Sequence, residues 1–114
     1  MDLPTVISIS SIPETATSHT QGMKRVIIDS TQTQTPITQV ATATLLAGES
    51  SGLHQHDTME EHFFFLEGKG TFIIDGVSHC ISPNIFVKIP PKVPHQLVAD
   101  SPLHFFYYGI AMPR

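Results

Sequence analysis

The stretch that decides the fold is residues 48–68, which read GESSGLHQHDTMEEHFFFLEG. His54 and His56 stand two positions apart, so on an extended segment both imidazoles point to the same face. Glu61 follows in the same stretch, and a third imidazole, His95, comes later in the chain. Three imidazoles and one carboxylate give an N3O donor set, which suits Fe, Mn, Ni, Co, Cu or Zn. The sequence therefore predicts a site for one divalent transition metal.

The spacing in this stretch resembles the first motif of the cupin superfamily, G-x5-H-x-H-x4-E-x6-G. Gly48, His54, His56, Glu61 and Gly68 reproduce that motif without a gap or an insertion. An isolated His-x-His on a strand is usually a surface pair. The glutamate spacing and the two glycines favour ligands instead.

A second stretch resembles the second cupin motif, G-x5-P-x-G-x2-H-x3-N. The matching positions are Asn84, Pro90, Lys92, His95 and Ala99. Asn84 and Lys92 stand where the motif has glycine. Asparagine tolerates a positive φ better than other non-glycine residues, so Asn84 is a mild change. Lys92 is a larger departure and leaves the shape of its turn open.

The resemblance covers about residues 38–112 and implies a jelly-roll β-barrel. The residue pattern agrees, because short β-branched or aromatic runs alternate with turn signals and no segment has a helix-length amphipathic pattern. Asp75-Gly76 predicts a type I′ hairpin turn. We therefore expect an all-β, cupin-type jelly roll in a single domain, with strands at 25–29, 37–46, 62–66, 71–75, 85–89, 96–99 and 103–110.

Composition limits the class of protein. The chain has 114 residues, of which 14% are charged and 40% apolar, as expected for one globular domain. Its net charge is −4 and its six cationic residues are scattered, so nucleic acid is not an expected partner. No apolar run is long enough to span a membrane. The lone Cys80 cannot form an internal disulfide, and we expect it to be buried in a cytoplasmic protein.

The N-terminal part differs from the rest, since the aromatic residues begin only at Phe63. We expect residues 1–23 to form an arm and residues 24–114 to form the cupin barrel. Cupins often exchange an N-terminal strand with a partner subunit, and Val6-Ile7 could start such a strand. With the apolar last strand, this favours a homodimer of C2 symmetry.

Strand alternation also predicts the surroundings of the metal. Phe63 and Phe65 share the parity of Glu61, and Leu97 shares that of His95, so these three apolar residues are expected to line the cavity. We expect a mostly apolar cavity without a lysine or arginine, in which the metal is the main polar anchor. Glu60 competes with Glu61 for the ligand position, because a bulge would exchange them.

The remaining histidines are expected to be structural or exposed, because none falls on a ligand position; they are His19, His62, His79 and His104. The last long strand carries His104, Phe106 and Tyr108 on one face. That face is expected to belong to the core or to a subunit interface.

Two classes of function stay open. The resemblance implies a metal-dependent enzyme acting on a small organic molecule, either a dioxygenase or an isomerase or lyase on a carbohydrate-like or carboxylate substrate. The alternative is a non-catalytic cupin that binds or senses a small ligand anchored by the metal. The spacing assigns no catalytic residue, although Glu60, Tyr107 or Tyr108 could act as a base.

Overall fold

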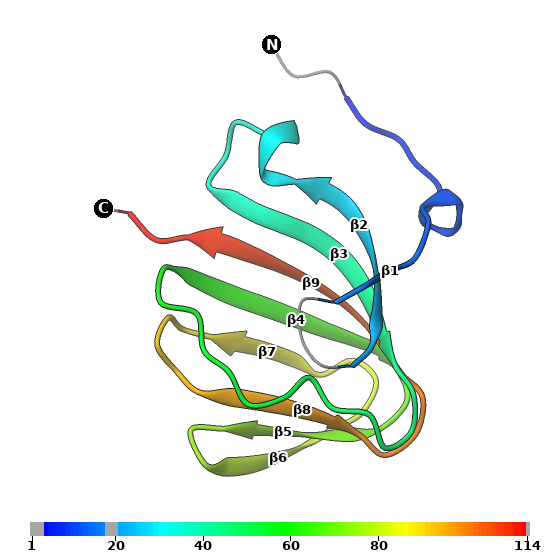
Figure 1. Cartoon of the computed structure of the whole chain (residues 1–114), viewed down its shortest axis with the longest axis vertical. Coiled ribbons are helices and arrows are strands. Elements are labelled where there is room, and N and C mark those ends of the chain that lie inside the picture. Colours follow the sequence, from blue (N-terminus) through cyan, green and yellow to red (C-terminus); the bar gives the residue numbers. More distant parts are fainter. Residues whose placement is uncertain (1–3, 18–20, 114) are drawn as a thin grey trace.

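The computed structural model describes residues 4–17 and 21–113, and its regular structure is almost entirely β (Figure 1). The elements in chain order are η1 (Ile9–Ser11), β1 (Thr15–Ala16), β2 (Met23–Asp29), η2 (Ser30–Gln32), β3 (Ile37–Leu45), β4 (Met59–Glu67), β5 (Gly70–Ile74), β6 (Val77–Ile81), β7 (Phe86–Ile89), β8 (His95–Ala99) and β9 (Leu103–Ala111). Both η elements are single 3-10 turns. Within the described ranges, no helix has the length and apolar character needed to cross a bilayer.

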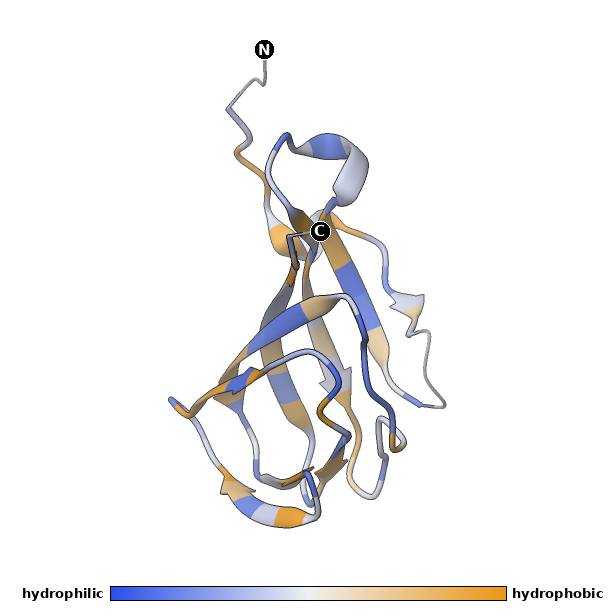
Figure 2. Ribbon diagram, turned by 90° about the vertical axis from the view of Figure 1, so that its left-hand side faces the viewer, coloured by the Kyte–Doolittle hydropathy of each residue, from blue (hydrophilic) through white to orange (hydrophobic). Residues whose placement is uncertain are grey.

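The strands form two sheets, which confirms the predicted all-β architecture. The larger sheet has the order β1-β2-β3-β9-β4-β7 and the smaller one the order β6-β5-β8, with antiparallel pairing throughout. Hydrophilic and hydrophobic residues alternate along the strands (Figure 2). The apolar faces meet in a core centred on Phe65, Phe72 and Leu103, each at most 1% exposed.

The loop of residues 48–56 is held as an irregular extra strand beside β8. Ser51 N donates to Leu97 O at 2.9 Å, and His54 and His95 exchange both backbone hydrogen bonds, at 3.0 and 2.9 Å. This antiparallel bridge places the His-x-His loop next to the strand that carries the third imidazole. Two segments far apart in the sequence are thereby joined through their backbones.

Turns in the predicted places have the backbone that their residues suggest. Asp75 and Gly76 have φ values of 49° and 80°, as the type I′ hairpin requires, and they join Ile74 to Val77. Lys92 adopts a φ of 67°, so it takes the left-handed conformation that the motif gives to glycine. Its N–H donates to His56 O at 2.7 Å, which fixes the turn against the His-x-His loop.

Gly68 shows why the first motif ends in glycine. Its φ is +88°, and a Cβ at this position would lie 2.0 Å from the carbonyl oxygen of Pro102. Gly48 has a φ of +83° but open space around it, so only its backbone conformation favours glycine. The close approach at Gly68 lets the turn after β4 pack against the start of β9.

The N-terminal residues contain one short strand that the sequence did not predict, and the exchange of a strand with a partner subunit stays a prediction. Val6 is fully exposed and belongs to no strand, whereas the unpredicted β1 pairs with β2. Arg25 holds the preceding segment, because its Nη1 donates to Ser10 O at 3.0 Å and to Ile12 O at 2.6 Å. The predicted arm of residues 1–23 lies partly outside the described residues.

The expectation that Cys80 is buried is wrong, because this thiol is exposed. Cys80 lies on β6, which is the edge strand of the smaller sheet and is exposed at every position except Ile81. An edge strand has a neighbour on one side only, so an apolar residue type does not guarantee burial there.

Candidate metal centre

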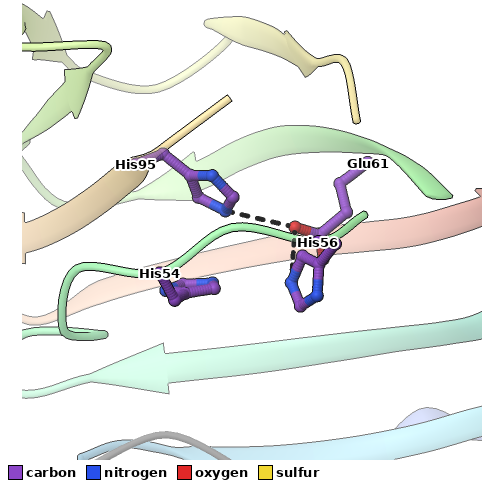
Figure 3. A group of neighbouring side chains, drawn as sticks. All are labelled: His54, His56, Glu61 and His95. Atoms are coloured by element: carbon purple, nitrogen blue, oxygen red, sulfur yellow. Dashed lines mark ion pairs between the residues drawn. The ribbon is translucent and has the colours of Figure 1, made fainter. Parts of the chain in front are cut away.

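The structure brings His54, His56, Glu61 and His95 together in one cluster (Figure 3). Each side chain offers one ligand atom, and these four atoms all lie within 4.8 Å of one another. The loop 48–56 supplies His54 and His56, the inner face of β4 supplies Glu61, and the first residue of β8 supplies His95. The backbone bridge between His54 and His95 therefore assembles the cluster from three parts of the chain.

The distances in this cluster fit a shared cation. Glu61 Oε1 lies 3.3 Å from His56 Nε2 and 3.3 Å from His95 Nε2. Two ligands with metal bonds of about 2.0–2.2 Å would be separated by about 2.8–3.6 Å at tetrahedral or octahedral angles. Glu61 and His95 are only 7% and 1% exposed. Glu61 Oε1 and His95 Nε2 make no hydrogen bond to any described residue, which is unusual for buried polar atoms, and a cation held between them would satisfy both.

Backbone carbonyl groups orient two of the imidazoles. His54 Nδ1 lies 2.9 Å from Gly52 O, and His95 Nδ1 lies 2.8 Å from Val93 O. A carbonyl oxygen can only accept, so Nδ1 carries a proton in both rings, and in the neutral ring Nε2 is then the atom that can bind a metal. This is the arrangement that a metal-binding histidine needs.

The alternation along β4 separates the two candidate carboxylates. Glu61 faces the interior, whereas Glu60 lies on the outer face of the sheet and accepts a 2.6 Å hydrogen bond from His62 Nε2. His62 Nδ1 in turn lies 2.9 Å from the hydroxyl of Tyr108. Glu60 therefore belongs to an outer-face network and lies outside the cluster. No bulge intervenes between the two glutamates, since both pair in register with β9.

A cavity of about 290 Å³ opens on the cluster. Its apolar lining includes Phe63, Phe72, Leu97 and Phe105. Phe65 is fully buried in the core behind this wall and is not among the lining residues. Such a site excludes much of the water around a bound ligand and strengthens its polar contacts.

The expectation of a cavity without lysine or arginine is wrong. Lys24 on β2 lines the cavity together with Gln39 and Tyr107. Lys24 Nζ lies 3.4 Å from Gln39 Oε1, and the Tyr107 hydroxyl donates to the same oxygen at 3.3 Å. The sequence offered one signal for Lys24: it stands two positions before Val26, so both side chains share a face of the strand. Without the strand pairing, nothing indicated that this face is the inner one.

Tyr107 is a hydrogen-bond donor at neutral pH. Burial, with a smaller contribution from the negative charge of Glu61, raises the pKa of Tyr107 to about 12. Its phenol therefore stays protonated, which argues against Tyr107 as the general base in this state of the site.

The other histidines of the described residues lie away from the cluster, as expected. His62 belongs to the outer-face network, His79 is exposed on β6, and His104 Nδ1 lies 3.0 Å from the hydroxyl of Thr44. Tyr108 and His104 share the outer face of β9 with Phe106. His19 lies outside the described residues.

Comparisons with known proteins agree with this geometry. The family model for the cupin domain matches residues 41–108. The uncharacterized protein MJ1618 of Methanocaldococcus jannaschii is 34% identical over 58 residues, which cover 51% of this chain and 46% of that protein. The alignment thus spans about half of the curated relative's length.

Solved structures share the fold over nearly the whole chain. A predicted oxalate decarboxylase from Thermotoga maritima has a TM-score of 0.88 at 21% identity, covering 95% of this chain and all of that one. An ectoine synthase from P. lautus has a TM-score of 0.82 at 16% identity, covering 96% of this chain and 80% of that one. At these identities the likeness establishes the fold alone.

Proposed function

This chain belongs to the cupin domain family, and from that premise we propose that it is a metal-dependent enzyme acting on a small organic molecule. The observation that carries the proposal is the buried Glu61 Oε1, 3.3 Å from the Nε2 atoms of both His56 and His95, at the wall of a cavity. His54, His56, Glu61 and His95 would hold the ion, and all four line the cavity that a substrate would enter.

The residues around the cavity have different roles in such a site. A bound divalent ion supplies Lewis acidity toward a substrate oxygen. His54 and His95 are held in the metal-binding tautomer by their carbonyl partners, so little reorganisation is needed on binding. The walls formed by Phe63, Phe72 and Leu97 keep water away from the reacting atoms. The Tyr107 hydroxyl, which donates to Gln39 Oε1 at 3.3 Å, would donate to a bound ligand instead.

The reaction we propose is that of a dioxygenase, or of an isomerase or lyase on a carbohydrate-like or carboxylate substrate. Both structural neighbours named above carry enzyme names, a predicted oxalate decarboxylase and an ectoine synthase, which supports an enzymatic role for this fold. The donor set of three imidazoles and one carboxylate suits iron and manganese as well as zinc, nickel, cobalt or copper.

Metal content tests the first half of the proposal. Purified wild-type protein should contain about one transition-metal ion per chain by elemental analysis, and His56→Ala should lose it. His79→Ala is the matched control, because His79 is an exposed histidine of the smaller sheet. A metal-free wild type after reconstitution, or a His79→Ala variant that loses metal while His56→Ala keeps it, would contradict the assignment.

Oxygen uptake then separates the reaction classes. The loaded protein is incubated with small hydroxy acids, keto acids and sugar acids while dissolved oxygen and substrate are both followed. Oxygen consumed in step with substrate identifies a dioxygenase. Substrate conversion without oxygen uptake identifies an isomerase or lyase, whereas binding without conversion of any compound would favour the non-catalytic alternative.

A further inference from the structure

Lys24 brings a positive charge into the cavity and forms no ion pair with any acidic side chain of the described residues. Its side chain is partly buried and lines the cavity, and its hydrogen bond goes to the neutral amide oxygen of Gln39. None of the ion pairs formed within residues 4–17 and 21–113 involves Lys24. Removing a charge from water is unfavourable unless a partner compensates it, so this ammonium group favours an anionic ligand.

The strand register places Lys24 inside the molecule. Lys24 pairs with Ala43 and Val26 pairs with Ala41, and both alanines are buried on the inner face of β3. Because alanine is small, the face of β3 beside Lys24 leaves room for the long lysine side chain. The ammonium group reaches along this face to Gln39, four residues before Ala43 on the same strand.

Gln39 makes long hydrogen bonds to both Lys24 and Tyr107, the two polar groups beside it in the cavity wall. Its Oε1 lies 3.4 Å from Lys24 Nζ and 3.3 Å from the Tyr107 hydroxyl. Both distances exceed the usual range of about 2.7–3.2 Å, so an anionic oxygen can replace the amide at little cost. The wall therefore offers an incoming ligand one cation and one neutral phenol donor.

We propose that Lys24, Gln39 and Tyr107 form a carboxylate-binding subsite, and that the substrate is a small molecule with one carboxylate distant from the oxygen that meets the metal. This inference rests on the proposed function. A divalent ion with one glutamate ligand carries a net charge of +1, and Lys24 adds a second positive charge. The cavity of about 290 Å³ holds the equivalent of about ten water molecules, which limits the substrate to a compact one.

Matched carboxylates test the subsite by calorimetry on cobalt-loaded protein. Malonate, succinate and glutarate carry a second carboxylate, whereas propionate, butyrate and valerate have the same chain lengths with only one. The best dicarboxylate should bind the wild type about tenfold or more tightly than its monocarboxylate partner, as a charge-assisted hydrogen bond allows. The visible spectrum of cobalt reports whether each ligand also enters the metal coordination.

Three variants test whether Lys24 and Gln39 cause the preference for dicarboxylates over monocarboxylates. Lys24→Met should abolish the preference for dicarboxylates, because it should weaken dicarboxylate binding far more than monocarboxylate binding. Gln39→Glu, which keeps the shape but gives Lys24 an internal counter-ion, should also abolish it. Lys69→Met is the control, because Lys69 is exposed in the turn after β4. A dicarboxylate preference that survives in Lys24→Met, or that is absent from the wild type, would overturn the inference.

Metal-free protein separates this inference from the proposed function. Without metal, the dicarboxylates should still bind the wild type more tightly than Lys24→Met, although more weakly than in the loaded protein. If this difference is present but the protein neither retains metal nor converts a substrate, the subsite stands and the enzyme proposal fails. If metal binds stoichiometrically but Lys24→Met changes nothing in either form, the subsite fails and the metal site stands.

Discussion

The two faces of β4 carry adjacent glutamates in opposite surroundings. Glu61 points into the sandwich, is 7% exposed and lies 3.3 Å from His95 Nε2. Glu60 points outward and accepts a hydrogen bond from His62 at the sheet surface. Both residues have the same chemistry and the same strand, so the difference comes from alternation alone: successive side chains leave a strand on opposite sides. One face builds a buried polar site, and the other forms a network that solvent can reach.

The aromatic residues of β4 show the same division. Phe63 and Phe65 are 7% and 0% exposed and stack in the core, whereas Phe64 is 41% exposed. Phe64 pairs in register with Phe86 on β7, which is 57% exposed. The outer face is therefore unusually aromatic for a surface in contact with water. Substitutions on the two faces of this strand should have distinct consequences.

The largest effect on stability should come from the inner aromatic residues. Phe65→Ala removes a fully buried ring from the core and should lower the free energy of unfolding by about 3–5 kcal/mol. Phe64→Ala, its outward neighbour, should cost about 1 kcal/mol or less. Urea denaturation followed by circular dichroism measures both. Equal losses for the two variants would mean that the outer face is as tightly packed as the inner one.

The paired glutamates should differ in metal affinity. Glu61→Gln removes the anionic ligand and should weaken binding by more than about 100-fold, because losing a group that only orients a ligand already costs about 10–100-fold. Glu60→Gln should change the affinity by less than about tenfold, since its carboxylate contacts His62 on the opposite face. Competition with a chelating dye measures both constants. A greater loss for Glu60→Gln would transfer the ligand role to the outer carboxylate.

The smallest expected effect concerns self-association. A homodimer is our prediction from the sequence, and the exposed pair Phe64 and Phe86 offers an apolar face for a second copy. Phe86→Glu should then raise the dimer dissociation constant about tenfold, as loss of a central aromatic contact does. Val77→Glu is the control, since Val77 is 58% exposed on the smaller sheet. Light scattering of the wild type as a monomer at micromolar concentration would contradict the prediction, and so would an equal effect of both variants.

The sequence alone predicted the all-β fold, and its resemblance to the cupin motifs predicted the cluster, with Glu60 left as an alternative to Glu61. Alternation on an extended chain was sufficient to place His54 and His56 on one face. Glu61 followed from the resemblance to the first cupin motif, because it stands an odd number of positions from both histidines. The hairpin turn at Asp75-Gly76 was predicted from these two residues alone, since tolerance of a positive φ depends on residue type. The His-x-His pair and this turn depend only on neighbouring residues, so the sequence is sufficient to predict them.

Only the tertiary structure decided what stands beside these residues. The backbone bridge between His54 and His95, the entry of Lys24 into the cavity and the exposure of Cys80 all follow from which strands pair and which lie at an edge. Alternation gives a strand two faces but does not say which one is inner when neither is wholly apolar, as on β2. Pairing with β3 determines which face of β2 is the inner one. Lys24, which the sequence leaves at the surface, therefore lies in the cavity wall.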